Sequence, residues 1–152
     1  MNSVNLYILC EGTKLDNWVD YQKVLTNSYE KKQLKNAEID TLKRFVNELL
    51  NWGIAIEDLD GFFYGFSIPQ ISKEFDLLKI FENDVVVNIE LKSNDIALDK
   101  IEYQLRKNRY YLSHLKKKIY SFTYVNSGEN GKIYSYDGDK LLESNIEEIA
   151  QL

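Results

Sequence analysis

Two carboxylates and a lysine stand at positions where strand geometry can bring them together. Asp76 lies in the segment 74–80, and Glu90 and Lys92 lie in the segment 85–92. Side chains at i and i+2 of a strand share a face, so Asn88, Glu90 and Lys92 form one polar row. The other face of that strand is apolar, with Val85, Val87, Ile89 and Leu91. A hairpin between the two segments would place Asp76 beside Glu90.

This combination of residues suggests a cation site. Carboxylates and a lysine gathered on one side of a sheet are costly unless something offsets their charge. Mg²⁺ would offset it, since this cation prefers a couple of carboxylates, some waters and phosphate oxygens. A second interpretation stays open, because alternating charged residues are also typical of a half-exposed antiparallel strand.

The helices and strands that must position these residues can be predicted from hydrophobic periodicity and from capping and turn residues. Helical spacing predicts helices over 16–30, over 36–53 with Asn36 as N-cap, over 96–116 with Asp95 as cap, and from Asn145 onward. Strands are predicted over 4–10, 61–66, 74–80, 85–92, 119–125 and 132–136, with Pro69 interrupting after the second and a turn at 82–84. The sequence predicts one α/β domain over 1–152, in which helices flank a small mixed sheet.

Composition excludes several classes of protein. The single cysteine, Cys10, excludes a disulfide framework and multi-cysteine metal sites, and the single histidine, His114, excludes histidine-dependent triads. His114 is expected on a solvent-facing part of a helix. The first residues show no signal peptide and no stretch approaches 18 apolar residues, so we expect a cytoplasmic protein without a membrane segment.

Charge is distributed unevenly along the chain. The net charge is −5, yet residues 97–119 hold seven basic residues against two acidic ones. That segment therefore carries +5 and the remainder −10. A solvated helix face would show the same pattern, so a binding role remains one of two interpretations.

The pattern of Asp76 in EFDLL and Glu90-Leu91-Lys92 in VNIELK, with thirteen residues between Asp76 and Glu90, resembles the PD-(D/E)XK nuclease superfamily. The expected order αβββαβ over about residues 36–125 also resembles the core of that restriction-endonuclease-like fold, here with an extra N-terminal helix. The chain departs from the family motif at Phe75, where proline often stands.

The long basic helix adds a partial match. Gln104, followed by Asn108, resembles the Gln-x-x-x-Tyr element of exonucleases in the family, although Asn108 occupies the tyrosine position and Tyr110 and Tyr111 come just after it. Helical geometry places Asn108 and Tyr111 each within about 40° of Gln104. An ordinary glutamine at the border of the apolar stripe is the alternative.

The resemblance implies a set of roles. Asp76, Glu90 and the Leu91 carbonyl would hold Mg²⁺ or Mn²⁺, and Lys92 would position or help deprotonate the attacking water. Glu38 is preferred over Glu48 as a further acidic ligand, because its position on the helix points inward whereas Glu48 should face water. The catalytic set would include Gln104, and the residues expected to contact backbone phosphates are Lys100, Arg106, Lys107 and Arg109.

The expected activity is metal-dependent cleavage of nucleic acid, DNA in preference to RNA. The alternative is a binding module for nucleic acid or protein that keeps the fold without catalysis. Further expected partners are a fused or associated ATPase or helicase, suggested by a final helix that runs to Leu152, and a second copy in a homodimer.

Overall fold

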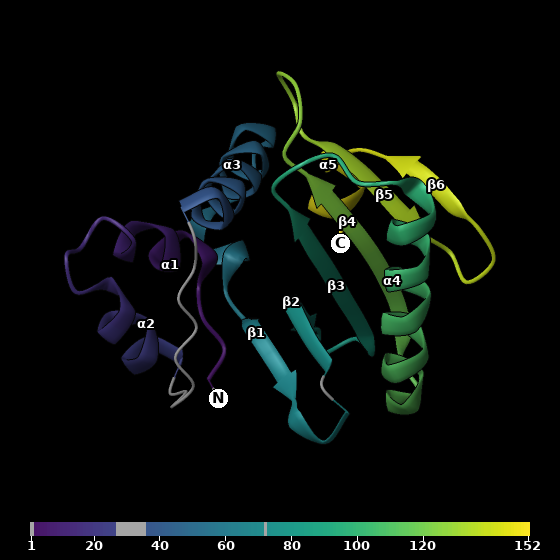
Figure 1. Ribbon diagram of the computed structural model, residues 1–152. Helices are drawn as coiled ribbons and strands as arrows, with labels where there is room; N and C mark the ends of the chain where they lie inside the picture. The colour runs from purple at the N-terminus through teal and green to yellow at the C-terminus, as the bar shows by residue number, and fades with distance from the viewer. Residues whose placement is uncertain (1, 27–35, 72) are drawn as a thin grey trace.

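The computed structural model describes residues 2–26, 36–71 and 73–152, and it shows helices packed on both faces of one sheet (Figure 1). The helices are α1 Leu6–Gly12, α2 Trp18–Thr26, α3 Asn36–Trp52, α4 Leu98–Leu112 and α5 Ile146–Ala150. The strands are β1 Phe62–Ile68, β2 Lys73–Ile80, β3 Val85–Lys92, β4 Lys118–Val125, β5 Lys132–Tyr136 and β6 Leu141–Ser144. Short 3₁₀ turns occur at Ile56–Leu59, Pro69–Ile71 and Ser113–Leu115.

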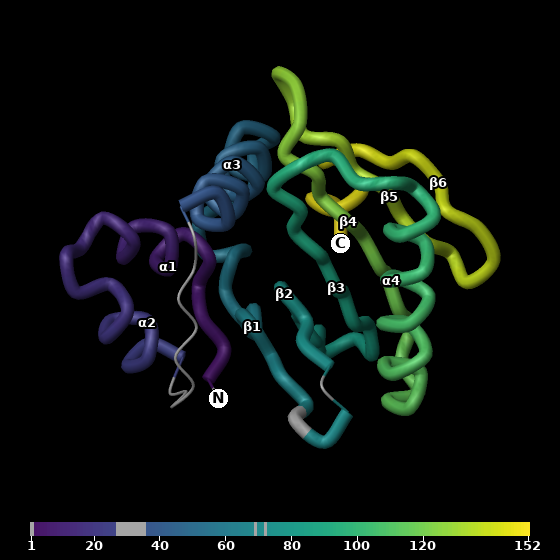
Figure 2. Tube along the Cα trace, in the orientation of Figure 1, coloured from purple at the N-terminus to yellow at the C-terminus, as the bar shows by residue number. Residues whose placement is uncertain are grey.

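The sheet is mixed, and its strands lie in chain order from β1 to β6. Neighbouring strands are antiparallel except β3 and β4, which run parallel. Because parallel neighbours cannot be joined by a tight turn, the chain crosses between them through α4 (Figure 2). From α3 to β4 the order of helices and strands is αβββαβ, and the general prediction of a mixed α/β fold is confirmed.

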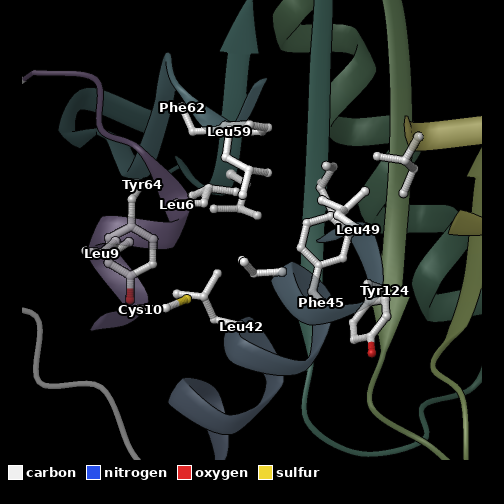
Figure 3. Packing of buried hydrophobic residues seen from close by; sticks show 14 of the residues in the cluster. Leu6, Leu9, Cys10, Leu42, Phe45, Leu49, Leu59, Phe62, Tyr64 and Tyr124 are labelled. Atoms are coloured by element: carbon white, nitrogen blue, oxygen red, sulfur yellow. The ribbon is translucent and has the colours of Figure 1, made fainter. Parts of the chain in front are cut away.

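The largest core lies on one face of the sheet. There α1, α3 and α5 pack on the alternate residues of β3 that were predicted to be apolar core (Figure 3). Phe45 of α3 and Tyr124 of β4 meet within it, with ring centroids 5.2 Å apart. On the other face α4 covers two smaller apolar clusters, one over β1–β3 and one over β4 and β5. The two faces of the sheet are therefore both buried.

The predicted strand over 4–10 is wrong, because this segment forms helix α1. Asn5 caps the helix, and its Oδ1 accepts hydrogen bonds from the backbone N–H groups of Tyr7 at 2.9 Å and Ile8 at 3.2 Å. Only Val4 pairs with the sheet, through an isolated bridge to Phe62. A satisfied helix N-terminus outweighs the apolar run that suggested a strand.

Helix α4 is shorter than predicted at both ends. Ala97, not Asp95, is its N-cap, and the helix passes into a 3₁₀ turn that ends where Lys116 adopts a left-handed conformation at φ 55°. Strand β6 was not predicted, since its sequence carries little alternation and it forms only by pairing with β5. Residues 27–30 of the predicted helix 16–30 lie outside the described residues.

Other boundaries agree closely with prediction. Helix α3 ends at Trp52, where Gly53 takes φ +119°, and the turn before β3 has Asp84 at φ 62°. Strands β3 and β5 have the predicted limits. Among the described helices, none is long and apolar enough to span a membrane.

Candidate functional site

The second strand changes face at Asp76. Tyr64 and Leu77 are paired in the β1–β2 ladder and belong to the core under α3. Phe66 and Phe75, paired one step further along, belong to the cluster under α4. In a regular strand residues two apart share a face, so both strands turn over at Gly65 and Asp76. Gly65 permits this turn because its φ of +64° lies in the left-handed region.

This turn sets Asp76 against the end of β3. Leu77 pairs with Ile89 and Leu78 with Asn88, so the same register places Asp76 opposite Glu90. There the backbone N–H of Leu91 donates to Asp76 Oδ2 at 2.9 Å. The carboxylate therefore replaces a main-chain acceptor and is held at the point where the ladder between β2 and β3 ends.

Glu90 is buried beneath α4. Its side chain is 1% exposed, and its Oε1 accepts hydrogen bonds from Asn108 Nδ2 at 2.6 Å and Asn88 Nδ2 at 3.4 Å. Asn108 Nδ2 also donates to Asn88 Oδ1 at 2.9 Å, and neither asparagine is exposed. The interpretation of this polar row as a half-exposed strand surface is therefore wrong.

The two carboxyl groups interact directly. Burial raises the pKa of Glu90 far above that of an exposed glutamate, and the charge of Asp76 and a hydrogen bond between the two side chains raise it further. Two carboxyl groups in direct contact cannot both be ionised without a large cost in free energy. The pair therefore favours a shared proton, or a cation in its place.

A lysine that the sequence analysis missed lies beside this pair. Lys73, at the start of β2, is 8% exposed, and its Nζ lies 4.9 Å from the centroid of the Phe75 ring. Burial lowers the pKa of Lys73, while the charges of Glu90 and Asp76 raise it. In a regular strand Lys73 and Asp76 would point to opposite faces. Only the turn at Asp76 brings them together, so the sequence pattern gave no signal for Lys73.

Two further lysines border the site. Lys92, partly buried at the end of β3, lies in the same row as Glu90, and Lys107 is exposed on α4. Both are close enough for their positive charges to lower the pKa of Lys73. Three lysines thus surround two carboxyl groups, an arrangement that suits an anionic ligand.

The main chain of Leu91 turns toward Asp76. The Lys92 carbonyl accepts from Asn126 N at 2.8 Å, on the β4 side of β3. Successive peptide groups of a strand point to opposite edges, so the Leu91 carbonyl points toward β2. Its N–H does the same, as the bond to Asp76 requires.

Glu38 faces the same region from α3. A cavity of about 50 Å³ is lined by Glu38, Thr41, Leu42, Tyr64, Asp76, Leu91 and Ser93. Glu38 itself is exposed, in the first turn of its helix. Glu48 was predicted to face water, and this prediction is wrong. This side chain is half-buried, and its Oε1 accepts a hydrogen bond from Gly131 N at 3.0 Å. Its place on the helix lies under the loop that leads into β5, which sequence periodicity could not foresee.

The donor set fits a hard divalent cation. Asp76, Glu90, the Leu91 carbonyl and Glu38 offer oxygen only, which is what Mg²⁺ and Mn²⁺ prefer. In the described ranges there is no group of three or more histidine, cysteine, aspartate or glutamate side chains placed to hold a metal. A cation here would thus depend on two carboxylates, the main-chain oxygen and water.

In α4, the asparagine and not the glutamine contacts the site. Asn108 bonds to Glu90, as described above, whereas Gln104 lies one turn earlier and is partly exposed. Within the described part of the chain no hydrogen bond joins Gln104 to Asp76 or Glu90. His114 is exposed as predicted, and its ring meets that of Tyr110 edge-on with centroids 5.5 Å apart.

The four basic residues expected to contact phosphates divide between two sides of α4. Lys100 and Lys107 are exposed on the side near β2. Arg106 pairs with Glu102 at 3.3 Å, and Arg109 Nη1 donates to the Ile119 carbonyl at 3.2 Å, on the side near β4 and β5. Arg109 therefore attaches α4 to the sheet, which is a structural use that its charge alone did not reveal.

Comparison of the chain with protein-family models, with curated proteins and with solved structures finds no match. The arrangement of Asp76, Glu90 and the lysines around them must therefore be interpreted from its own geometry.

Proposed function

We propose that this protein is a divalent-cation-dependent nuclease that hydrolyses phosphodiester bonds, in DNA rather than RNA. The observation that supports it is the meeting of Asp76 and Glu90 at the end of the β2–β3 ladder, with Lys73 and Lys92 beside them. The order αβββαβ and the residues at these positions resemble the PD-(D/E)XK nucleases. The order of elements supports the proposal independently of the contacts within the site.

The residues of the site have two roles: some would bind the cation, and others would compensate charge on the phosphate. Asp76, Glu90 and the Leu91 carbonyl would hold Mg²⁺ or Mn²⁺, with Glu38 across the small cavity. Such an ion, when bound, stabilises charge on the phosphate and lowers the pKa of a bound water. In the reaction the water loses a proton as its oxygen bonds to phosphorus, the bond to the leaving oxygen breaks, and that oxygen takes up a proton.

The lysines and asparagines complete the site. Lys92 would orient the attacking water, and Lys73 would offset the negative charge that grows on the phosphate oxygens. Asn108 and Asn88 fix the Glu90 carboxyl by donating to one of its oxygens, which leaves the second oxygen for a cation. Neither asparagine would touch the substrate.

The test is a cleavage assay on single- and double-stranded DNA and RNA with Mn²⁺, Mg²⁺ or EDTA. We expect cutting that requires metal and that is lost, by at least a hundredfold, in Lys92→Ala and Glu90→Ala. Lys132→Ala, which changes an exposed lysine at the start of β5, is the matched control and should cut normally. Cutting that persists in Lys92→Ala, or in EDTA, would refute the proposal.

One observation favours the alternative of a non-catalytic binding module. Asn88 and Asn108 already donate to Glu90, so this carboxyl has partners without a cation. A thermal melt separates the two functions. A nuclease site should be stabilised by Mn²⁺ in the wild type and not in Glu90→Ala, whereas a binding module should melt at one temperature with Mn²⁺ or EDTA.

A further inference from the structure

The outer face of α4 carries exposed tyrosines between lysines. Tyr103 is 63% exposed and Tyr110 is 64% exposed, unusually high values for aromatic residues in a folded domain. They lie seven residues apart, so their rings project from nearly the same side of the helix about 10.5 Å apart along its axis. Lys100 and Lys107 lie along one flank of these tyrosines, roughly 40–80° around the helix, and both are exposed.

The ring of Tyr110 is held in place by its neighbours. Tyr110 meets Tyr111 edge-on at 5.4 Å between centroids and His114 at 5.5 Å. Tyr111 in turn packs partly buried against the cluster formed by Phe75 and its neighbours. Tyr110 is thus supported by its neighbours while most of its surface stays exposed, which lowers the entropy lost when a ligand stacks on it.

This surface adjoins the candidate site. The charge of Lys107 acts on Lys73, which lies beside Asp76 and Glu90. In Figure 1 α4 is the outer layer on its side of the sheet, and no other helix lies between it and β2. The segment 97–119 is also the basic part of an otherwise acidic chain.

We propose that the outer face of α4 binds single-stranded nucleic acid, with bases stacked on Tyr103 and Tyr110 and phosphates against Lys100 and Lys107. Lysines alone would suit any polyanion, but aromatic faces add stacking that every unpaired base can use. A duplex keeps its base faces inside and presents phosphates and base edges, on which a tyrosine ring cannot stack. The inference deepens the proposed nuclease function by naming the form of its substrate, and binding can be measured without cleavage.

The experiment is fluorescence anisotropy with a labelled 30-nucleotide oligo-dT and a 30-base-pair duplex, in EDTA at low salt. We expect wild-type protein to bind the single strand at least fivefold more tightly than the duplex. Tyr103→Ala and Tyr110→Ala should each weaken that binding about fivefold or more with an unchanged salt dependence, since stacking carries no charge. Lys100→Ala combined with Lys107→Ala should make the dependence on salt shallower.

Two matched variants act as controls. Lys132→Ala removes an exposed basic residue from the start of β5, and Trp52→Ala removes an exposed aromatic ring from α3. Both should bind the single strand within twofold of wild type. The inference would be overturned by equal affinity for the duplex, by unchanged binding in both tyrosine variants, or by no binding to either nucleic acid. The last result would point to a protein partner for this face.

The outcomes also separate this inference from the proposed function. Tyrosine-dependent binding without any metal-dependent cleavage would uphold the surface and refute the nuclease. Metal-dependent cleavage with full single-strand binding in both tyrosine variants would support the nuclease and refute the binding surface. Circular dichroism of each variant verifies the fold, and because both rings are largely exposed we expect unchanged melting temperatures.

Discussion

At the scale of single residues, Glu90 is the one buried acidic side chain in the described part of the chain. A carboxyl group that is 1% exposed is rare unless it is paired or neutral. Here its neighbours are two amides and a second carboxyl, so the amides satisfy hydrogen bonding while the negative charge is compensated only by the lysines nearby. Such an arrangement lowers stability in the absence of a cation and is consistent with a residue retained for binding.

We expect Glu90→Gln to stabilise the protein in EDTA at alkaline pH. The folded state raises the pKa of Glu90, so between the ordinary pKa and the raised one the folded protein holds a proton that the unfolded chain has released. Stability therefore falls as pH rises through this window, and glutamine removes that loss. Urea unfolding should show the variant more stable than wild type by on the order of 1 kcal/mol at pH 8, with the gap shrinking toward pH 5.

The exposed Glu82 in the turn before β3 provides the control, because Glu82→Gln should shift stability by less than about 0.5 kcal/mol at either pH. A Glu90→Gln variant that unfolds more easily than wild type at pH 8 would show that the ionised carboxylate is fully compensated by its lysines.

At the scale of elements, the two sides of helix α4 have different roles. The side toward β2 carries Asn108, which reaches Glu90, and Lys107, which faces solvent near the site. The side toward β4 and β5 carries Arg109, whose guanidinium lies against Gly138 and donates to the Ile119 carbonyl. The helix is thus anchored on one side and available to a ligand on the other.

Arg109→Ala should therefore reduce stability and Lys107→Ala should not. Losing the hydrogen bond from Arg109 to the Ile119 carbonyl, together with packing over Gly138, should lower the free energy of unfolding by about 1 kcal/mol or more. Lys107 is exposed, so its removal should change stability by less than about 0.5 kcal/mol. Thermal melts at equal ionic strength measure both. Equal stability of the two variants would mean that Arg109 is as free as its charge pattern first suggested.

At the scale of the whole molecule, α1 is joined to the domain through the core that also carries α3. Cys10 of α1 is 6% exposed and lies in the same apolar cluster as Leu42 and Tyr64 (Figure 3). Burial raises the pKa of the Cys10 thiol to about 12. A thiol in that state is unreactive, because the thiolate is the nucleophile.

The sole cysteine therefore reports on the integrity of the domain. In native buffer at pH 8, a disulfide reagent such as Ellman's should label Cys10 far more slowly than it labels the urea-unfolded chain. The rate should rise with urea in parallel with unfolding followed by circular dichroism. Immediate labelling in native buffer would show that α1 opens independently of the rest.

Much of the fold could be predicted because local patterns agree with the tertiary structure. The alternation in β3 and the helical stripe of α3 located both elements within a residue or two, and the apolar residues of β3 face the core under α3 as predicted. Side-chain period and end signals act over a few residues, so a single sequence carries them. For the same reason the pairing of Asp76 with Glu90 followed from a hairpin of adjacent strands.

The rest was decided by contacts between distant residues. The cap at Asn5 is the exception, a local signal that the apolar run over 4–10 obscured, whereas β6 exists only through its pairing with β5. The reversal at Gly65 and Asp76 brought Lys73 to the site, while α4 buried Glu90 beneath Asn108. Sequence alone fixed which polar residues lie on one strand face. Burial of that face, and with it the unusual energetics of Glu90, arises only when a helix from elsewhere in the chain covers it.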